Sequence, residues 1–480
     1  MIKEQLVMNN VSFKYPQGQH FALQNINLSV MEGEFLAVMG ENGAGKTTLC
    51  KLINGIIPHI SKGMLSGTVT AAGCLTTDFS VSQLALKVGM VLDDPDAQLL
   101  TSTVRNEAAF GPENLCFPEQ EIERLVKDAL VSVGLCGFED RAPVTLSGGE
   151  KQRLSIAASL AMKGKILVLD EPLCRLDPQG VQEVMSVLKE IKEKYKLTII
   201  MTEHNSKMIY KYADRVCILN KGCIVSLDTP EKIFANPELL EENGISSVKE
   251  NEKIFVETKP PLNPVIDIKG FSYFYNDGIS IEDINLSFAE NDFAAITGSN
   301  GCGKTTLLKN ITGLLRPCGG DILIRGKSVK KMPVSDISKE AGYVMQNPDS
   351  QLFTDSVYNE VAFSLKNKYS KTEIKQRVEE ALFLTGLKDP DAYPHALSKA
   401  DRTKTVIACV LAMGPKIMIF DEIDAGYDYK NNLQIIDIFN KLYSKGITVI
   451  FVTHNMFLAN AAHRLIKMDR KGIIFDGRQN

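Results

Sequence analysis

Two glycine-rich segments carry the residues whose types and spacing best suit a defined chemistry. Each segment reads G-x-x-x-x-G-K-T, first at residues 40–47 and again at residues 298–305. Glycines let backbone N–H groups close around a phosphate, and a helix that starts there adds a favourable dipole. The lysine and the threonine that end each segment are placed to reach terminal phosphates and to bind magnesium. The two segments therefore predict two sites for a nucleoside triphosphate.

Both segments lie between an apolar run and a helical pattern. Residues 35–39 are apolar and predict a buried strand, and residues 49–53 continue in a helical pattern. Strand, glycine loop and helix form the context that this P-loop motif requires. A chance glycine turn would explain one segment, but not the same segment written twice. The predicted nucleotide-binding residues are those of both loops and of the helical start after each: Gly40, Glu41, Asn42, Gly43, Ala44, Gly45, Lys46, Thr47, Thr48, Gly298, Ser299, Asn300, Gly301, Cys302, Gly303, Lys304, Thr305 and Thr306.

Each half of the chain alternates strand-like apolar runs with amphipathic helical stretches. Residues 166–169 and 198–201 are two of these β-rich runs. Strands that alternate with helices pair in parallel, and a parallel sheet needs cover on both faces. We therefore predict an α/β fold with two tandem P-loop nucleotide-binding domains, each a mainly parallel sheet flanked by helices.

The two halves can be laid over each other along most of their length. Residues 25–29 (NINLS) match residues 283–287 (DINLS) at an offset of 258 residues, and the two P-loop lysines keep that offset. Later landmarks keep a smaller offset, because the first half carries an insertion around residues 59–65. A repeat this long indicates duplicated domains rather than a solenoid. We predict a first domain, a polar and proline-bearing linker and a second domain, at residues 1–245, 246–264 and 265–480.

Composition limits the function. The chain has 480 residues, too many for one core, with 44% hydrophobic and 23% charged residues. A net charge of −4 gives no reason to expect nucleic acid as a partner. Its 10 cysteines lie singly without a C-x-x-C pair, which favours reduced thiols over disulfides or a zinc site. The start is not signal-like and no run of about 18 apolar residues occurs, so we expect a chain that does not itself cross a membrane.

The string LSGGEKQR at residues 146–153 is the most specific in the sequence. It resembles the signature of ATP-binding-cassette (ABC) ATPases, and the other motifs of that family follow in order. A serine and two glycines at a helix N-terminus can present a hydroxyl and close amides to a γ-phosphate, although the same residues also make a good N-cap. The resemblance implies an α-helical subdomain that carries this motif, and two cassettes paired head to tail. In such a pair each nucleotide is capped by the signature of the other cassette, here Ser147, Gly148, Gly149 and Glu150.

Each half also has an apolar strand that ends in an Asp-Glu pair. These pairs are Asp170-Glu171 and Asp421-Glu422. Taken alone, an acidic pair after a strand is most simply a solvated strand end. The resemblance implies that the aspartates hold Mg²⁺ and that the glutamates polarise the attacking water. The ligand set that it implies for the metal is Thr47, Asp170, Thr305, Gln346 and Asp421.

Histidines, tyrosines and one glutamine complete the family's set. The family has a γ-phosphate-sensing histidine at the end of a strand, the position of His204 and of His454. It stacks an aromatic ring on adenine at the positions of Tyr15 and Tyr275, where a π-face suits the base. Gln346 resembles the glutamine that touches magnesium and links the ATP site to a membrane partner. The catalytic residues implied by the resemblance are Glu171, Glu422, His204, His454 and Gln346.

A finer resemblance comes from two segments in each half. QNPDSQLF at residues 346–353 and DPDAQLL at 94–100 are followed by NEVAF at 359–363 and NEAAFGPEN at 106–114. This pattern is similar to the ATPase subunits of energy-coupling-factor (ECF) transporters, which take up vitamins and transition-metal ions in prokaryotes. It implies ATP and Mg²⁺ as cofactors and a peripheral position on the cytoplasmic face of the cell membrane. The implied partners are a transmembrane coupling protein, docked near the glutamine loop, and a small membrane protein that binds the solute.

Two positions depart from the family pattern. The second signature reads LSKADR at residues 397–402, so Lys399 and Ala400 replace both glycines. Their side chains are expected to obstruct the close backbone approach that glycine permits, although the charge of Lys399 could offset part of the loss. The first half has Asp93 where the second has Gln346, which changes a charge and two hydrogen-bond donors.

Head-to-tail pairing would place both departures at one ATP site. The hypothesis is a consensus site, made of Lys304 with residues 146–150, and a degenerate site, made of Lys46 with residues 397–401. The degenerate site is expected to bind ATP and to hydrolyse it slowly, because it keeps its glutamate and histidine. The sequence leaves open the transported solute, which another polypeptide would select, and the oligomeric state.

Three other classes of protein share parts of this pattern. The tandem ATPase of sugar importers has a similar length, but the N-P-D-x-Q-L strings argue against it. Ribosome-associated tandem cassettes carry a long, charged helical linker, and the linker here is short. A DNA-repair or chromosome cassette would need a coiled coil or a zinc insertion, and the sequence contains neither.

Overall fold

The computed structural model describes residues 3–248, 253, 255–257, 262–275, 280–366 and 368–479. The chain divides into two compact units. The first contains Met1–Lys249 and Gly426–Lys430, and the second contains Glu250–Ala425 and Asn431–Asn480. The predicted linker, residues 246–264, lies partly outside the described residues. Each unit is described by itself.

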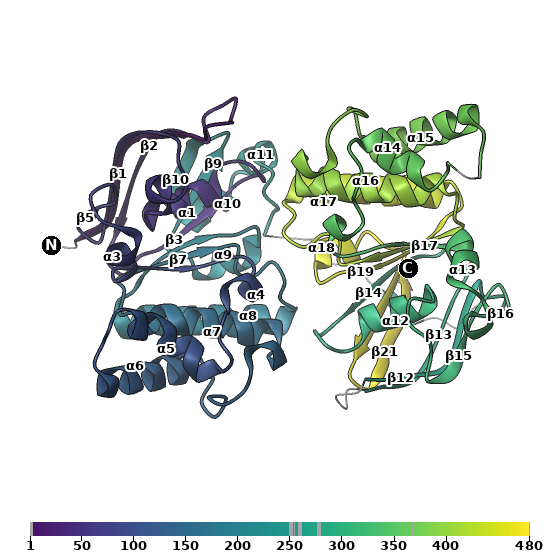
Figure 1. The fold of residues 1–480 in the computed structure, drawn as a ribbon, viewed down its shortest axis with the longest axis horizontal. Coiled ribbons are helices and arrows are strands. Elements are labelled where there is room, and N and C mark those ends of the chain that lie inside the picture. The colour runs from purple at the N-terminus through teal and green to yellow at the C-terminus, as the bar shows by residue number, and fades with distance from the viewer. Residues whose placement is uncertain are drawn as a thin grey trace. The chain divides into compact units, whose positions relative to one another are not determined.

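The first unit is built on a six-stranded sheet (Figure 1). Every neighbouring pair in it is parallel except β10 with β9. The predicted apolar runs are strands of this sheet, so the predicted parallel sheet is confirmed. Its strands in spatial order are β10 (Cys223–Asp228), β9 (Arg215–Asn220), β3 (Phe35–Met39), β8 (Thr198–Thr202), β7 (Ile166–Asp170) and β6 (Val88–Val91).

The two faces of this sheet have different cover. Side chains alternate across a strand, and alternate residues of β3 accordingly belong to two different cores. One core contains residues of the long helices, and the other contains residues of α1 (Lys46–Ile53) and of a separate antiparallel sheet (Figure 1). The long helices on the first face are α5 (Val104–Asn114), α6 (Glu119–Ser132), α7 (Gly148–Ala161) and α8 (Pro178–Tyr195).

The antiparallel sheet is a feature that the sequence pattern did not predict. Its strands in spatial order are β2 (Leu23–Met31), β1 (Glu4–Lys14), β4 (Met64–Ala71) and β5 (Cys74–Leu75). Strand β1 buries Leu6, Met8, Val11 and Phe13 against α1 and one face of the parallel sheet. Helices therefore lie on both faces of the parallel sheet, as predicted, and on one face this second sheet adds to the cover that α1 provides.

The second unit repeats this plan. Its larger sheet is again parallel from β20 to β17, and β20, β21 and β11 pair antiparallel at the other edge. Strand β11 falls inside the predicted linker and pairs with the C-terminal strand. The spatial order is β11 (Phe255–Glu257), β21 (Gly472–Gln479), β20 (Arg464–Asp469), β14 (Phe293–Gly298), β19 (Thr448–Val452), β18 (Ile417–Asp421) and β17 (Ala341–Val344). The four-stranded antiparallel sheet is β13 (Ser280–Phe288), β12 (Ile266–Phe274), β15 (Gly319–Ile324) and β16 (Lys327–Ser328).

A helical subdomain in the second unit has its own apolar core. Residues of α14 (Val357–Phe363), α15 (Lys371–Thr385) and α16 (Lys399–Ala412) form that core. The signature position lies at the start of α16, as α7 carries it in the first unit, so the predicted subdomain is confirmed. Further helices of the chain are α9 (Ser206–Tyr212), α12 (Lys304–Ile311), α17 (Tyr429–Ser444) and α18 (Met456–Ala459). Among the described residues, no helix combines the length and apolar character that crossing a bilayer requires.

A buried arginine ties β20 to the rest of the second unit. Arg464 is 2% exposed and its guanidinium donates to Asp292, to both oxygens of Asp476 and to the Ser287 carbonyl. In the first unit Arg215 occupies the same place and pairs with Glu34, but its side chain is 30% exposed. A buried charge that loses its partner costs more than an exposed one.

Arg464→Met is therefore expected to lower the free energy of unfolding of the second unit by about 3 kcal/mol. That value is at the low end for a broken buried pair, because Asp292 keeps its contact with Arg478. The matched change Arg215→Met is expected to cost about 1 kcal/mol, since that arginine is partly exposed and Glu34, although buried, keeps its hydrogen bond from the Met31 backbone N–H. Denaturant unfolding of the full chain measures both. Equal decreases in the free energy of unfolding for the two variants would show that the burial of Arg464 does not determine the cost of losing it.

Candidate functional site

In each unit the P-loop joins a buried strand to a helix, and its glycines are conformationally required. Gly40 has a φ of 145°, and a Cβ there would lie 2.0 Å from the Leu219 carbonyl oxygen. Gly298 has a φ of 154°, and a Cβ there would lie 2.1 Å from the Met468 carbonyl oxygen. A side chain at either position would displace the neighbouring strand, so only glycine lets the loop close.

The helices that follow start without a side-chain cap. Gly45 and Gly303 are the N-caps of α1 and α12, both in the left-handed region, and neither helix has an acidic residue in its first turn. The first amides of a helix have no intrahelical acceptor, and a helix N-terminus attracts anions. The residues present therefore suit a phosphate group at both loops.

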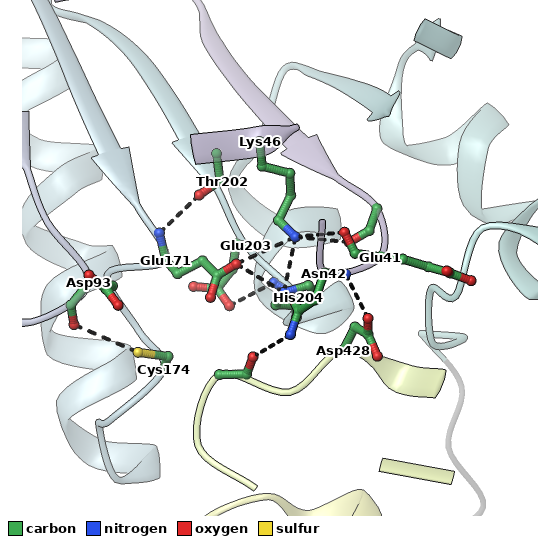
Figure 2. Close-up of polar contacts among 12 residues, drawn as sticks. Glu41, Asn42, Lys46, Asp93, Glu171, Cys174, Thr202, Glu203, His204 and Asp428 are labelled. Atoms are coloured by element: carbon green, nitrogen blue, oxygen red, sulfur yellow. Dashed lines mark hydrogen bonds and ion pairs between the residues drawn. The ribbon is translucent and has the colours of Figure 1, made fainter. Parts of the chain in front are cut away.

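The P-loop lysine of the first unit lies among carboxylate and imidazole groups (Figure 2). Lys46 Nζ donates to the carbonyls of Gly40 and Glu41 at 3.1 and 3.2 Å, and the side chain is buried. It also lies 3.4 Å from Glu171 Oε1 and 3.3 Å from His204 Nε2. His204 Nε2 is in turn 3.1 Å from Glu171 Oε1. The structure thus brings together three of the predicted residues of this half.

The second unit assembles the same group with one addition. Lys304 Nζ donates to the carbonyls of Gly298 and Ser299 at 3.0 and 3.1 Å. His454 Nε2 lies 3.0 Å from Glu422 Oε1, and Gln346 Nε2 donates to Glu422 Oε2 at 3.0 Å. Lys304 is 3.8 Å from the same carboxylate. The glutamine predicted for this half therefore contacts the glutamate directly.

The first unit lacks that amide and has Asp93 in its place. The backbone carbonyl of Asp93 accepts a contact from Cys174 Sγ at 3.7 Å (Figure 2). A carboxylate cannot donate to Glu171 as Gln346 does to Glu422, because an ionised carboxylate only accepts. The first unit also includes residues 426–430, as described above. In this segment Asp428 Oδ2 accepts a hydrogen bond from the backbone N–H of Asn42, a P-loop residue, at 2.7 Å.

The two glutamates share an unusual backbone conformation. Glu171 and Glu422 follow β7 and β18 with φ values of 48° and 45°. Non-glycine residues in this region are uncommon and cost on the order of 1–3 kcal/mol. The backbone N–H of Glu171 donates to Thr202, and that of Glu422 donates to the Val452 carbonyl. The surrounding structure must hold this unfavourable backbone conformation, which is consistent with a fixed direction for each carboxylate.

Both glutamates are held ionised. Burial alone would raise the pKa of Glu171, but the hydrogen bond and charge of His204 and the charge of Lys46 lower it to about 2. The pKa of Glu422 is also lowered, since His454 and Lys304 outweigh the effect of burial. An ionised carboxylate at neutral pH can accept a proton from water.

The two aspartates that end the same strands are almost completely buried. Burial raises the pKa of Asp170 and of Asp421, and hydroxyl donors oppose that rise. Thr305 Oγ1 donates to Asp421 Oδ1 at 3.0 Å, and Thr47 makes the corresponding hydrogen bond to Asp170. A carboxylate beside a hydroxyl offers the hard oxygen ligands that Mg²⁺ prefers. The donor set therefore fits that ion in both units.

The predicted adenine-stacking tyrosines lie against the helices that follow the P-loops. Tyr15 Oη is 3.2 Å from Thr48 Oγ1, and Tyr275 Oη is 2.8 Å from Thr306 Oγ1. Each ring also packs edge-on against the aromatic residue two positions earlier in its strand. The structure places both rings at the same point of their units, and their contact with adenine remains a prediction.

The signature helices of the two units start differently. Ser147 caps α7 in a reciprocal capping box with Glu150, so both residues are engaged inside that turn. Ser398 caps α16, and Lys399 Nζ donates to the Ala425 carbonyl at 2.6 Å. The expectation that Lys399 offers its charge to a nucleotide is thus qualified, because this ammonium group binds a backbone carbonyl of its own unit.

Several polar residues beside the glutamates were not predicted. Glu203, next to His204, is buried and accepts from the backbone N–H of His204 and Asn205. Asp424 is buried in the second unit, where burial raises its pKa to about 6 and Thr453 Oγ1 donates to it at 2.6 Å. Tyr343 donates to Asp421 at 2.7 Å. The sequence alone gives only one signal for them, namely a polar residue inside or next to an apolar strand.

Comparison with known proteins agrees with the motifs. A family model described as ABC transporter matches residues 23–174 and 281–425. A protein of Caldanaerobacter subterraneus subsp. tengcongensis named as an ABC transporter ATP-binding protein is 36% identical over 97% of this chain and 90% of its own. One of Methanosarcina acetivorans with the same kind of name is 36% identical over 98% of this chain and 86% of its own.

A solved structure was also matched. It is cbiO1 from Clostridium perfringens, described as part of the ABC transporter complex cbiONQ. It is 34% identical, covers 50% of this chain and 94% of its own, and has a TM-score of 0.45.

The family model spans both P-loops, and the curated relatives match nearly the whole chain. The chain therefore belongs to the ABC transporter family and carries two tandem ATP-binding cassettes of an ATPase.

Proposed function

We propose that this chain is the ATP-hydrolysing, energy-coupling subunit of a prokaryotic ECF-type importer for a vitamin or a transition-metal ion. It would lie peripherally on the cytoplasmic face of the membrane. Its partners would be a transmembrane coupling protein and a small solute-binding membrane protein. The support comes from the segments that resemble ECF ATPases, whose side chains have definite structural roles in both units.

The glutamine of the N-P-D-x-Q-L string anchors the loop that follows the edge strand, which is β17 in the second unit and β6 in the first. Gln351 accepts from the Met345 backbone N–H at 2.8 Å and donates to the Tyr343 carbonyl at 3.2 Å. In the first unit Gln98 makes the same pair of contacts with the backbone of Leu92 and Met90. One amide side chain thus holds both sides of the loop, which only a group with donor and acceptor can do.

The glutamate of the next string fixes the far end of that loop. Glu360 is buried and accepts from the backbone N–H groups of Phe353 and Thr354 at 3.0 and 2.7 Å. Glu107 does the same for Leu100 and Thr101 in the first unit. Charge-assisted hydrogen bonds of this kind are about twice as strong as neutral ones. The loop is therefore held in one conformation from within.

An exposed aromatic pair, formed by one residue of this loop and one of α14, is the observation that carries the proposal. Phe353 is 62% exposed and Phe363 is 53% exposed, and their rings pack edge to face with centroids 4.7 Å apart. In the first unit, Leu100 and Phe110 are exposed at the corresponding positions. Large apolar side chains held in the open by buried polar anchors are typical of a protein–protein contact. A helix of a coupling protein is the occupant that the ECF resemblance indicates.

Within the ATPase cycle, the site residues would divide the work by their chemistry. Lys46 and Lys304 would bind terminal phosphates, and the ionised Glu171 and Glu422 would accept a proton from water. His204 and His454 would hold those carboxylates in position. A bound Mg²⁺ ion would neutralise phosphate charge, and the oxygens placed to hold it are those of Thr47, Asp170, Thr305 and Asp421, with Gln346 in the second unit.

The two cassettes would pair head to tail and form two unequal ATP sites. The consensus site would combine Lys304 with the signature at residues 146–150. The degenerate site would combine Lys46 with residues 397–401. Two observations within the units support the inequality: Gln346 hydrogen-bonds Glu422 while Asp93 cannot do so for Glu171, and Lys399 binds the Ala425 carbonyl.

The aromatic pair gives a direct test of the transport function. Phe353→Ser together with Phe363→Ser is expected to remove most of the membrane protein that co-purifies with the tagged full chain from its native host, because two anchor residues are lost. The matched control is Phe383→Ser, a side chain on α15 that is 81% exposed but does not belong to the aromatic pair. Mass spectrometry of detergent-solubilised complexes measures the partners. Unchanged capture by the double variant would contradict the docking surface.

The same experiment separates the competing functions. Integral membrane proteins of the ECF type in the wild-type sample would support the proposal. Sugar-importer membrane subunits would indicate the other transport class, and ribosomal proteins would indicate a cassette that acts in translation.

A further inference from the structure

The carboxylate of Asp421 has a hydroxyl donor on each oxygen. Thr305 Oγ1 donates to Oδ1 at 3.0 Å, and Tyr343 Oη donates to Oδ2 at 2.7 Å. Asp421 is 3% exposed, so water has little access to it. A buried carboxylate without its donors is costly. The tyrosine comes from β17, the strand on one side of β18.

The first unit satisfies the equivalent aspartate from the opposite side. Thr202 Oγ1 donates to Asp170 Oδ1 at 2.7 Å. The same hydroxyl accepts from the backbone N–H of Glu171 at 2.9 Å, a bond drawn in Figure 2. Thr202 lies on β8, where it is the register partner of Asp170. The residue of this unit that corresponds to Tyr343 is Met90, which has no hydroxyl and is contacted at its sulfur by the side chain of Asn54.

The second unit shows the reverse arrangement. The register partner of Asp421 on β19 is Val452, which has no hydroxyl either. The two strands beside Asp170 therefore contribute Met90 and Thr202, and the two strands beside Asp421 contribute Tyr343 and Val452 at the equivalent positions. Each aspartate keeps one strand-borne hydroxyl in addition to its P-loop threonine, but the hydroxyl comes from opposite neighbouring strands.

We propose that Tyr343 and Thr202 are positioning residues that orient the two metal-binding aspartates, and that the strand positions they occupy are interchangeable sources of one required hydroxyl. The proposal rests on the metal-binding role of Asp421 given above. A donor on one carboxylate oxygen fixes the rotation of the group, so that its remaining lone pairs keep one direction. Partners of this kind behind a metal ligand typically change metal affinity about 10- to 100-fold when removed.

The test uses the full chain in a Lys46→Ala background, so that the second P-loop gives the signal. Binding of Mn²⁺ in the presence of ADP is measured by electron paramagnetic resonance. Tyr343→Phe is expected to weaken Mn²⁺ binding about tenfold. Adding Val452→Thr to Tyr343→Phe is expected to restore it, because the new hydroxyl would stand where Thr202 stands beside Asp170. Thermal unfolding without metal and nucleotide reports whether each variant is folded.

Each outcome bears on a different part of the argument. Asp421→Asn with unchanged Mn²⁺ binding would remove the metal-binding role itself, and with it the proposed function of that residue. Weaker binding for Asp421→Asn but not for Tyr343→Phe would overturn only the inference about the tyrosine. A Tyr343→Phe defect that Val452→Thr does not repair would show that the two positions are not interchangeable. A repaired defect supports the proposal, since a role in packing alone would not be restored by a hydroxyl on the other strand.

Discussion

Replacing Glu422 with glutamine is expected to reduce ATP turnover by the full chain roughly 100-fold or more, whereas Glu171→Gln is expected to leave most of it. A general base contributes about 10²- to 10⁴-fold to a rate, and glutamine cannot accept the proton. The two changes are matched, because both glutamates follow a buried strand with a positive φ and contact a histidine and the P-loop lysine. The difference between them therefore reports the inequality of the sites.

The inequality is expected from the surroundings of the two carboxylates. Gln346 donates to Glu422, so that glutamate is linked to the loop that leads to the exposed aromatic pair. Asp93 stands in place of this amide in the first unit, and Glu171 lies closer to its lysine, at 3.4 Å rather than 3.8 Å. In the proposed pairing, Glu171 would also act at the site with the altered signature.

Steady-state phosphate release at saturating ATP measures both variants. Nucleotide binding, followed by the rise in melting temperature on addition of ATP, serves as the control, since glutamine keeps the shape of the side chain. Equal losses in the two variants would mean that both sites hydrolyse ATP at similar rates, and the division into consensus and degenerate sites would be abandoned. A larger loss for Glu171→Gln would reverse the assignment.

Local features of the site could be predicted from sequence. The P-loops, the strands that end in Asp-Glu and the helix that starts at Ser147 each depend on residues adjacent in the chain. Their patterns, such as glycines before a lysine or an apolar run before an acid, are set by short-range geometry. The structure places these elements where the pattern requires.

Features that depend on pairing between distant segments could not be predicted in the same way. The antiparallel sheet joins β1 to β4 across more than one intervening element, and alternation alone does not choose a partner strand. The hydroxyl beside Asp421 comes from Tyr343, which in the sequence resembles any other core residue of an apolar strand. The role of Lys399 was also out of reach, because its acceptor is a backbone carbonyl of Ala425 that no side-chain pattern reveals.

These differences have a common physical origin. A backbone carbonyl or a hydroxyl on a neighbouring strand becomes a partner only after the sheet has set its register. Sequence reasoning therefore identifies which groups do chemistry, and the fold decides which groups hold them in place. The difference between the two cassettes requires both the sequence and the structure. The altered signature is visible in the sequence, whereas the hydrogen bond from Lys399 to the Ala425 carbonyl is visible only in the structure.

Transplanting the altered signature is the second large effect that we expect. Gly148→Lys with Gly149→Ala gives the first signature the residues of the second at these positions, and ATP turnover is expected to fall roughly 100-fold, the cost of losing one preorganised donor to a developing charge. A Cβ on Gly149 would meet the nearest atom, Gly180 Cα, at 3.4 Å, an ordinary contact, so this change does not force the helix apart.

The reciprocal change supplies the control and the strongest test of the idea. Lys399→Gly with Ala400→Gly, made in a Glu422→Gln background, is expected to raise the residual ATP turnover about tenfold, because removing the two side chains would let a phosphate approach the backbone amides at the proposed degenerate site. Two glycines in the first turn of α16 cost about 1 kcal/mol each in helix stability, so thermal unfolding is measured beside phosphate release. Full activity of the Gly148→Lys/Gly149→Ala variant would mean that the signature glycines do not act on nucleotide. If Gly148→Lys/Gly149→Ala lowers turnover but the reciprocal variant does not raise it, the slow hydrolysis of the proposed degenerate site would be attributed to Asp93. Asp93→Gln in the Glu422→Gln background would then be the change that restores turnover.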